Sequence, residues 1–390
     1  MNPNVVIHPS KQSLIQQGHP WIFSKAVLRQ DSSCRTGMLV NVVSNAGDLL
    51  AVGVYNEHSL YRVRILARTV EDFNQDSLAA IILHRLQQAI QLRQRLNLPN
   101  AHTTAFRLVN SEADGLSGLT IDKFDTLCVV SSSAFWVQAN QAVILECLKT
   151  LLPDTEILWM AQKKPLLQDG WEQDTEVSYD KQMIVKEQDL LFKIDFSTAQ
   201  KTGLFLDQRE NHQRVAAVAK GARVLDLYTY TGGFALHAAK AGAEYVLGID
   251  SSGPAIARAQ ENAQLNQCTQ LEFIKADARS YLHRAEEFDI VVLDPPKLMP
   301  SKKNQVQAKN YYRFLHKEVF KVMRPNTLLM TCNCSSALSA HAFLELVYLQ
   351  ALSVKKSFRV IGSYGPASCH PTLPVFPEGS YLTAVMGVVV

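Results

Sequence analysis

The sequence is poor in charge and has no long apolar run. Of its 390 residues, 19% are charged and 47% are hydrophobic, which is typical of an ordinary globular protein and excludes a disordered chain. No stretch approaches the roughly eighteen consecutive apolar residues of a transmembrane helix, so we expect no membrane partner. The opening MNPNVVIHPSKQS lacks the basic-then-apolar order of a secretory signal, so we expect none. A formal net charge of +3 only weakly indicates a polyanionic partner.

Cysteine is scarce and follows no regular spacing. Seven cysteines are scattered along the chain, and an odd, unpatterned set argues against a disulfide scaffold. Reduced thiols and a cytoplasmic location are therefore expected. No C-x-x-C pair or nearby Cys/His cluster occurs, so we predict no metal site. Two thiols nevertheless stand one residue apart, Cys332 and Cys334 in the stretch LLMTCNCSS.

The length and the pattern of apolar segments predict three parts. A chain of 390 residues is too long for one ordinary core. Short apolar segments separated by turn residues fill residues 1–72 and predict a small β-barrel or sandwich. Residues 73–184 combine strand patterns with helical patterns near 76–96 and 136–152, which predicts a compact α+β module. A hairpin, MIVKEQDLLFKIDF, leads into the third part, residues 185–390.

The third part alternates apolar strands with helices. Its candidate strands read RVLDLY, YVLGID, LEFIKAD, DIVVLD and TLLMTCN. Near-continuous apolar strands between helices predict a parallel sheet covered on both faces, which is a doubly wound, Rossmann-like α/β domain. A ligand of such a sheet is expected at the carboxyl ends of its strands.

Polar residues at those strand ends indicate a nucleoside cofactor. The first strand carries Asp226 into a glycine turn at 232–233, without the G-x-G-x-x-G pattern that seats a dinucleotide pyrophosphate. An acid there suits a cationic amino-acid ligand, Asp250 can accept from ribose hydroxyls, and residues 277–278 follow the third strand beside an adenine position. This ordered set looks like S-adenosylmethionine binding in class I methyltransferases. The alternative is that each aspartate only caps the following helix.

The fourth and fifth strands end in groups that fit cytosine chemistry. Asp294 opens the run DPPK, and neighbouring strands should bring it close to the cysteines. Carbon 5 of cytosine is too weak a nucleophile to take a methyl group unaided. A thiolate adding to carbon 6 activates it, and an acid that protonates nitrogen 3 favours the addition. We predict Cys334 as the nucleophile and Asp294 as the acid, and expect Cys332 to pack in the core.

The two cysteines and the DPPK run also fit other roles. The cysteines could be buried apolar side chains or a C-x-C redox pair. The run DPPK alone suits methylation of a planar amino nitrogen, so a guanine-nitrogen methyltransferase is the rival enzyme. A non-catalytic RNA-binding module with a vestigial cofactor fold is the third alternative.

Longer motifs succeed one another along nearly the whole chain. They are GHPWIFSKAV from Gly18, FRLVNSEADGLSGLTIDKF from Phe106, QKTGLFLDQRENH from Gln200, then YTYTGGFALHAA, DPPK, TCNCS and HPTLPVFPEGSYL. In this order they resemble the PUA-domain class I methyltransferases that modify bacterial 23S ribosomal RNA. The resemblance implies an N-terminal PUA barrel that binds RNA, S-adenosylmethionine as cofactor and large-subunit ribosomal RNA as partner, and it leaves a homodimer open. In this family the thiol followed by serine is taken as the nucleophile, which is Cys334 here.

The site residues that follow fall into three groups. The catalytic pair is Cys334 and Asp294. The expected cofactor ligands are Asp207, Asp226, Tyr228, Gly232, Gly233, Asp250, Ser251, Asp277, Ala278 and Asp294. The expected RNA contacts are Arg209, Lys297 and His370, although Arg209 could equally form an ordinary surface salt bridge.

Two segments depart from the family pattern. The family usually has Asp-His-Pro where this chain has Cys369-His370-Pro371, and a Gly-Tyr-Lys stretch where it has YYRFLH from Tyr311. Both departures bear on the choice of target base.

Overall fold

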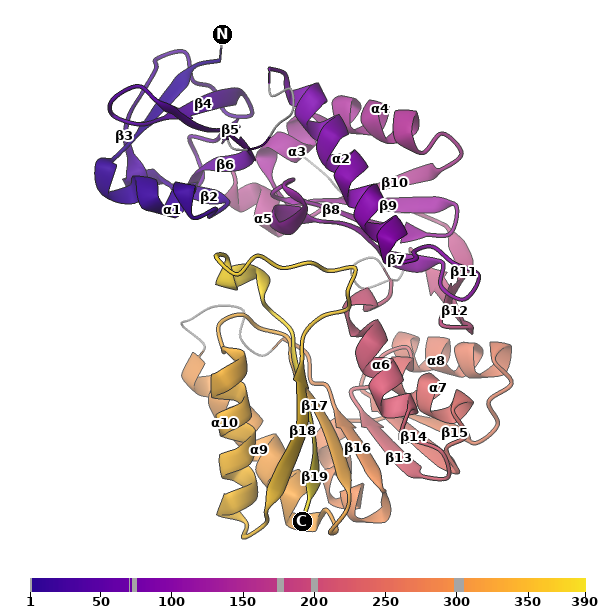
Figure 1. Ribbon diagram of the computed structural model, residues 1–390. Coiled ribbons are helices and arrows are strands. Elements are labelled where there is room, and N and C mark those ends of the chain that lie inside the picture. The colour runs from indigo at the N-terminus through magenta and orange to yellow at the C-terminus, as the bar shows by residue number, and fades with distance from the viewer. Residues whose placement is uncertain (1, 70, 72–75, 174–178, 198–202, 298–304) are drawn as a thin grey trace. The chain divides into compact units, whose positions relative to one another are not determined.

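The computed structural model describes residues 2–69, 71, 76–173, 179–197, 203–297 and 305–390. The predicted boundary at 72–73 and residues 200–202 of the QKTG run lie outside these ranges. The described chain forms two compact units (Figure 1). The first comprises Met1–Tyr179 with Cys369–Gly379, and the second comprises Asp180–Ser368 with Ser380–Val390.

The N-terminal part of the first unit is a small β domain. Its sheet runs in the order β2 (Trp21–Phe23), β6 (Tyr61–Arg68), β5 (Leu49–Tyr55), β4 (Leu39–Val43), β1 (Asn4–Ile7) and β3 (Val27–Gln30), with a short helix α1 (Gln12–Gln16). Alternating residues of these strands, such as Val40, Val42 and Val63, are fully buried in one apolar core. The period-two pattern in the sequence therefore produces the predicted β domain.

The rest of the first unit is the predicted α+β module. Its sheet has the order β10 (Glu156–Ala161), β9 (Leu127–Ser132), β8 (Leu119–Phe124), β7 (Ala105–Asn110). Its helices are α2 (Leu78–Arg95), α3 (Phe135–Ala139), α4 (Gln141–Leu151) and α5 (Lys163–Gln168). Ser77 caps α2 by accepting from the Ala80 N–H at 3.1 Å. The single helix predicted over 136–152 is divided at Asn140, which leaves the helical conformation between α3 and α4.

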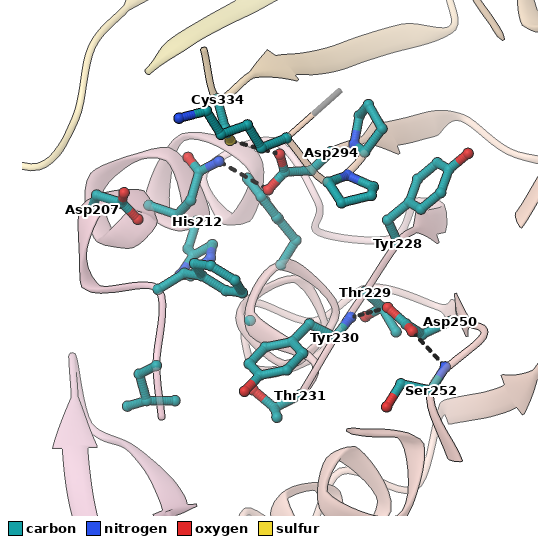
Figure 2. Close-up of a pocket in the computed structure, with 18 of the residues that line it drawn as sticks. Asp207, His212, Tyr228, Thr229, Tyr230, Thr231, Asp250, Ser252, Asp294 and Cys334 are labelled. Carbon is teal, nitrogen blue, oxygen red and sulfur yellow. Dashed lines mark hydrogen bonds between the residues drawn. The ribbon is translucent and has the colours of Figure 1, made fainter. Parts of the chain in front are cut away.

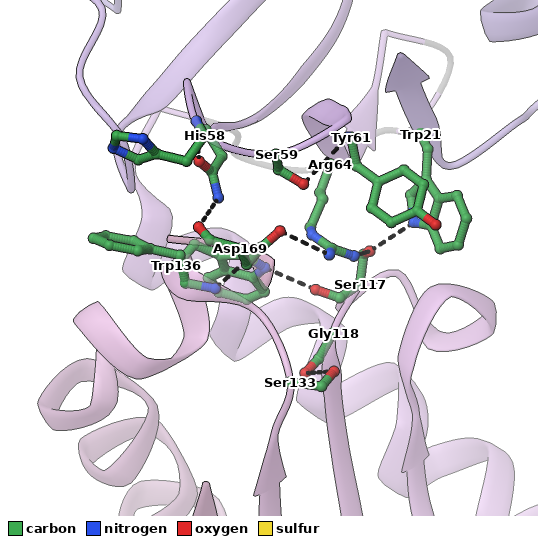
Figure 3. Close-up of polar contacts among 12 residues, drawn as sticks. Trp21, His58, Ser59, Tyr61, Arg64, Ser117, Gly118, Ser133, Trp136 and Asp169 are labelled. Atoms are coloured by element: carbon green, nitrogen blue, oxygen red, sulfur yellow. Dashed lines mark hydrogen bonds and ion pairs between the residues drawn. The ribbon is translucent and has the colours of Figure 1, made fainter. Parts of the chain in front are cut away.

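A buried arginine joins the two parts of the first unit (Figure 3). Arg64 lies on β6 and is 7% exposed. Its guanidinium donates to Ser117 Oγ at 3.0 Å and lies 3.5 Å from an Asp169 carboxylate oxygen. The Asn56 side chain also donates to the Asp169 carbonyl oxygen, at 2.8 Å. Buried charges need such partners, so these polar contacts hold the β domain on the module.

The second unit opens with a hairpin. Strands β11 (Gln182–Glu187) and β12 (Leu190–Asp195) pair antiparallel through a two-residue turn. Gln188 and Asp189 have φ values of 53° and 69°, the left-handed pair of a tight hairpin turn whose twist matches that of the strands. Helix α6 (Arg209–Ala216) then precedes the main sheet.

The main sheet has seven strands. Their order is β15 (Leu271–Lys275), β14 (Tyr245–Asp250), β13 (Arg223–Leu227), β16 (Ile290–Leu293), β17 (Leu328–Asn333), β19 (Thr383–Val389), β18 (Phe358–Tyr364). The five predicted strands are mutually parallel, and β16 and β17 are neighbours as expected. The sheet is not wholly parallel, because β19 runs antiparallel to both β17 and β18. No sequence pattern had identified these last two strands.

Helices cover the sheet at both ends. Helices α7 (Gly233–Lys240) and α8 (Gly253–Leu265) pack on β13, β14 and β15, and α10 (Ala340–Ser353) packs on β18 and β19 beside α9 (Gln305–Val322) (Figure 1). One apolar core joins strand residues such as Leu225 and Val291 to residues of α9 and α10, including Phe343. In the described part of the chain, no helix is both long enough and apolar enough to cross a membrane.

Candidate active site at the strand ends of the second unit

A cavity of about 550 Å³ opens at the carboxyl ends of β13, β14, β16 and β17 (Figure 2). This volume is in the usual range for a small-molecule site. The predicted site residues that line the cavity are Asp207, Tyr228, Gly233, Asp250, Ser251, Asp294, Lys297 and Cys334. The fold therefore brings together residues from five separate stretches of sequence at the position expected for a doubly wound sheet.

The turn after β13 is strained and tightly held. Tyr228 and Tyr230 have φ values of 67° and 52°, which residues other than glycine seldom adopt. Thr229 between them bonds through its N–H to the Ile249 carbonyl at 3.0 Å. Gly232 follows at a φ of 90°, and a Cβ there would lie 2.9 Å from the Phe273 ring. Surrounding contacts thus fix a backbone shape that only glycine permits at position 232.

Asp226 stabilises this turn through hydrogen bonds and does not line the cavity. It is 1% exposed, and its Oδ2 accepts from Thr229 Oγ1 at 2.5 Å and from the Ala235 N–H at 3.1 Å. Its Oδ1 has no hydrogen-bond partner among the described residues. Burial raises the pKa of Asp226 to about 6. In this arrangement the carboxylate anchors the start of α7.

Asp250 is held by backbone donors and faces the cavity. It accepts from the Tyr230 N–H at 3.0 Å and from the Ser252 N–H at 2.8 Å. A carboxylate has about four lone-pair positions, so two remain available to a ligand. The geometry suits a pair of ribose hydroxyls.

Asp294 and Cys334 meet where β16 and β17 end. The Cys334 Sγ lies 3.7 Å from Asp294 Oδ1, and Gln208 Nε2 donates to Asp294 Oδ2 at 2.9 Å. Gln208 is itself oriented by the Asn211 side-chain amide, which donates to its Oε1 at 2.7 Å. Burial, reinforced by the nearby Asp207 carboxylate, raises the pKa of Asp294 to about 7. Asp294 can therefore hold or release a proton close to neutral pH.

Cys332 differs from Cys334 in burial and in surroundings. Its side chain is 0% exposed and its residue pairs with Ala384 on β19, inside the sheet. Burial raises the pKa of its thiol well above the usual value, and the Asp294 carboxylate adds to this. It is absent from the cavity lining, whereas Cys334 belongs to it.

Asp207 supplies a second carboxylate to the cavity wall. It is 8% exposed and accepts from the Tyr381 hydroxyl at 2.7 Å. Sequence reasoning identified Asp207 but not Tyr381, although Tyr381 stands in the PEGSYL motif. It also missed Gln208, His212 and Thr231 as lining residues. Gln208 lies in the QKTG run beside Asp207, whereas His212 and Thr231 carry no separate signal in the sequence.

Several predicted ligands lie outside the cavity lining. Asp277 is exposed and caps the 3-10 helix Ala278–Glu287 by accepting from the Arg279 N–H, and it also pairs with the Arg279 guanidinium. Ala278 is buried in the apolar core. Gly232 does not line the cavity, but its positive φ allows the turn after β13 to form. For Asp277 the arrangement matches the helix-cap alternative.

The three expected RNA contacts have different surroundings. Lys297 is exposed and lines the cavity. Arg209 donates to Glu210 at 2.9 Å, so it forms a salt bridge, but at 4% exposure this bridge is buried and not at the surface as the alternative had it. His370 lies in the first unit, 3% exposed, with its Nδ1 at 3.3 Å from the Cys369 thiol. Of these three residues, Arg209 and His370 are buried and only Lys297 is exposed to solvent.

The cavity residues fit S-adenosylmethionine. The fixed glycine turn allows backbone to approach a ligand, Asp250 keeps two acceptor positions, and the Asp207 carboxylate can meet a cationic amino group. The rings of Phe205, Tyr230 and Phe234 add apolar wall for a nucleoside.

Comparisons with known proteins agree over nearly the whole chain. A family model described as S-adenosylmethionine-dependent methyltransferase matches residues 166–363, and one for a PUA-like domain matches residues 5–68. Ribosomal RNA large subunit methyltransferase I of Alteromonas mediterranea is 32% identical over 99% of this chain and 98% of its own length. The protein of that name from Aliivibrio fischeri is 30% identical over 98% of each chain.

A solved structure shares the complete fold. It is described as a candidate S-adenosylmethionine-dependent methyltransferase from Streptococcus mutans, and it superposes with a TM-score of 0.80 over 99% of both chains. The sequence identity is 16%, so this likeness concerns the fold alone.

Proposed function

Because the chain belongs to the S-adenosylmethionine-dependent methyltransferase family, together with the ribosomal RNA large subunit methyltransferases I, we propose that it methylates carbon 5 of a cytosine in large-subunit ribosomal RNA. The cofactor, when bound, supplies an electrophilic methyl group. The chain's own task is to make carbon 5 nucleophilic and to manage the protons.

The observation that carries this proposal is the contact between Cys334 and Asp294. A methyltransferase acting on an amino nitrogen needs no thiol, whereas addition to carbon 6 of cytosine requires one. The thiol here faces the cavity, 3.7 Å from a carboxyl group whose pKa is raised to about 7. These are the nucleophile and the acid that the cytosine reaction requires, held at one point of the wall.

The proton balance follows from this pair. One proton shared between Cys334 and Asp294 passes to nitrogen 3 of the base as the sulfur bonds to carbon 6. After carbon 5 has accepted the methyl group, water takes the carbon 5 proton, which leaves as the one net proton of the reaction. The sulfur–carbon 6 bond then breaks, and the proton on nitrogen 3 returns to the pair. Gln208 holds Asp294 in place throughout through its 2.9 Å hydrogen bond.

RNA binding is assigned to two places. Lys297 stands exposed at the cavity, where its ammonium group can contact a phosphate. The PUA-like β domain, residues 5–68, is the second proposed contact. Arg209 and His370 would each have to leave a buried position to reach RNA, so we rank them below Lys297.

Trapping with 5-fluorocytidine tests the covalent step. An adduct on this base cannot lose a carbon 5 proton after methylation, so the protein should stay bound to a ribosomal RNA transcript after denaturation. We expect the wild type and the matched variant Cys332→Ala to form this complex, and Cys334→Ala to form none. If the adduct disappears only in Cys332→Ala, Cys332 is the nucleophile and Cys334 is not. If neither substitution affects methylation, covalent catalysis is wrong and a guanine-nitrogen target replaces it.

A further inference from the structure

Two histidines and a glutamate form a buried cluster at one end of the cofactor cavity. Glu187 ends β11, His212 lies in α6 and His237 lies in α7, and they are 2%, 6% and 5% exposed. His212 Nδ1 lies 2.8 Å from Glu187 Oε1, and His237 Nε2 lies 3.6 Å from the same oxygen. One potential ligand atom from each residue lies within 4.8 Å of the other two.

His237 presents a lone pair to this cluster. Its Nδ1 lies 2.8 Å from the Gly233 carbonyl oxygen, which can only accept, so Nδ1 carries the proton in neutral imidazole. Its Nε2 is then an acceptor, and it has no hydrogen-bond partner among the described residues. A buried imidazole lone pair facing a carboxylate oxygen is electrostatically unfavourable, unless a cation lies between them. A carbonyl that fixes the tautomer in this way is the usual support of a metal-binding histidine.

We propose that Glu187, His212 and His237 bind one Zn²⁺ ion. Two imidazole nitrogens and a carboxylate oxygen are ligands that zinc prefers, and three protein ligands leave a fourth position for water. Glu187 and His212 line the cavity, so this fourth position opens toward it. The three ligands come from different elements, so the ion would cross-link the β11–β12 hairpin to α6 and α7 beside the cavity. This role is separate from the chemistry proposed for Cys334.

Metal analysis of the full-length protein tests the site. Bound metal is first removed from the protein with a chelator and by dialysis. The protein is then incubated with Zn²⁺, excess metal is removed, and the zinc content is measured by inductively coupled plasma mass spectrometry. We expect about one zinc per chain in the wild type and in His283→Gln, a control at an exposed histidine elsewhere in the second unit. His237→Gln and Glu187→Gln each remove a direct ligand, so each should weaken zinc binding by more than the roughly 10- to 100-fold that loss of an outer-shell partner costs. If the wild type takes up no zinc, or if the variants keep full zinc affinity, the proposal is wrong. The negative charge of Glu187 is then compensated by a protonated histidine and not by a metal ion.

Cobalt substitution separates this site from the cysteines and does not require a variant to fold. Co²⁺ bound by nitrogen and oxygen gives visible d–d bands without a thiolate-to-cobalt charge-transfer band. In the wild type we also expect paramagnetically shifted imidazole signals from two coordinated histidines. A strong thiolate band, or the absence of shifted imidazole signals, would overturn the assignment.

Discussion

The Cys334 sulfur lies 3.7 Å from Asp294 Oδ1, although forty residues separate them in the chain. Each follows directly on one of two adjacent parallel strands, with Leu293 on β16 opposite Thr331 on β17. The two side chains therefore meet because the sheet ends there, and no loop has to bring them together. A catalytic pair on residues that directly follow strands is positioned more precisely than one far out on loops.

Replacing Asp294 should stabilise the protein while abolishing activity. The folded-state pKa of this carboxyl is raised from 3.8 to about 7, so its proton stabilises the fold fully below about pH 4, and this contribution is lost as the pH rises through 7. Asp294→Asn stays neutral, and at about pH 8 it should be on the order of 1–4 kcal/mol more stable than the wild type. Urea unfolding at several pH values measures this. The difference should narrow as the pH falls below 7; a difference independent of pH would show that Asp294 ionisation does not cause it.

Gln208 should set the pH at which Asp294 works. Its amide donates to the Asp294 carboxylate and lowers that group's pKa against the effects of burial and of Asp207. Gln208→Leu removes the donor, so the Asp294 pKa should rise, and the alkaline limb of the kcat/KM profile should move to higher pH. The rate should also fall, because the carboxyl loses its orientation. Gln208→Glu is the matched comparison of similar size, and its added negative charge should shift the limb further in the same direction. An unchanged pH profile in both variants would remove Gln208 from the site.

The sequence predicts those parts of the fold whose strands and helices have a clear local pattern of apolar residues. The predicted class, a PUA-like domain followed by an α/β methyltransferase domain, is confirmed by the family matches. The last two strands, the edge strand β18 and its neighbour β19, escaped prediction because β19 enters the sheet from the far end of the chain, and its partners are set by long-range pairing. The Arg64–Asp169 contact joins the β domain to the module across the predicted boundary. The two residues are far apart in the sequence, so no local pattern reveals this contact.

The site was predictable where residues follow directly on strands. Asp250, Asp294 and Cys334 were predicted from their places at strand ends, and all three line the cavity. The same rule also predicted Asp277, whose side chain does not line the cavity and bonds to the following helix and to Arg279. It missed the Glu187, His212 and His237 cluster altogether, because its members lie on a hairpin and two helices and have no metal-ligand spacing in the sequence.

Arg64 should be an important polar link between the β domain and the α+β module of the first unit. Arg64→Ala leaves the buried Asp169 carboxylate without its arginine partner, and breaking such a pair costs about 3–5 kcal/mol. Arg29→Ala, at an exposed arginine of the same β domain, should change stability by less than about 0.5 kcal/mol. Hydrogen exchange of the full chain should show lost protection in residues 2–173 and little change in the second unit. Equal effects of the two substitutions would mean that the contact contributes nothing.

Asp250 and Asp277 offer a direct test of how the cofactor is held. Both were predicted as ligands from the ends of adjacent strands, but only Asp250 lines the cavity. Asp250→Ala removes a charged acceptor and two backbone contacts of the turn, so S-adenosylmethionine affinity should fall by roughly 1.5–3 kcal/mol, or about 10- to 150-fold. Asp277→Ala removes a helix cap, so it should cost about 0.5–2 kcal/mol of stability with a much smaller change in affinity. Calorimetric titration of both folded variants decides between the two roles. If Asp277→Ala weakens binding as strongly as Asp250→Ala, the bound cofactor extends past the cavity to the third strand, and Asp277 is a ligand as well as a cap.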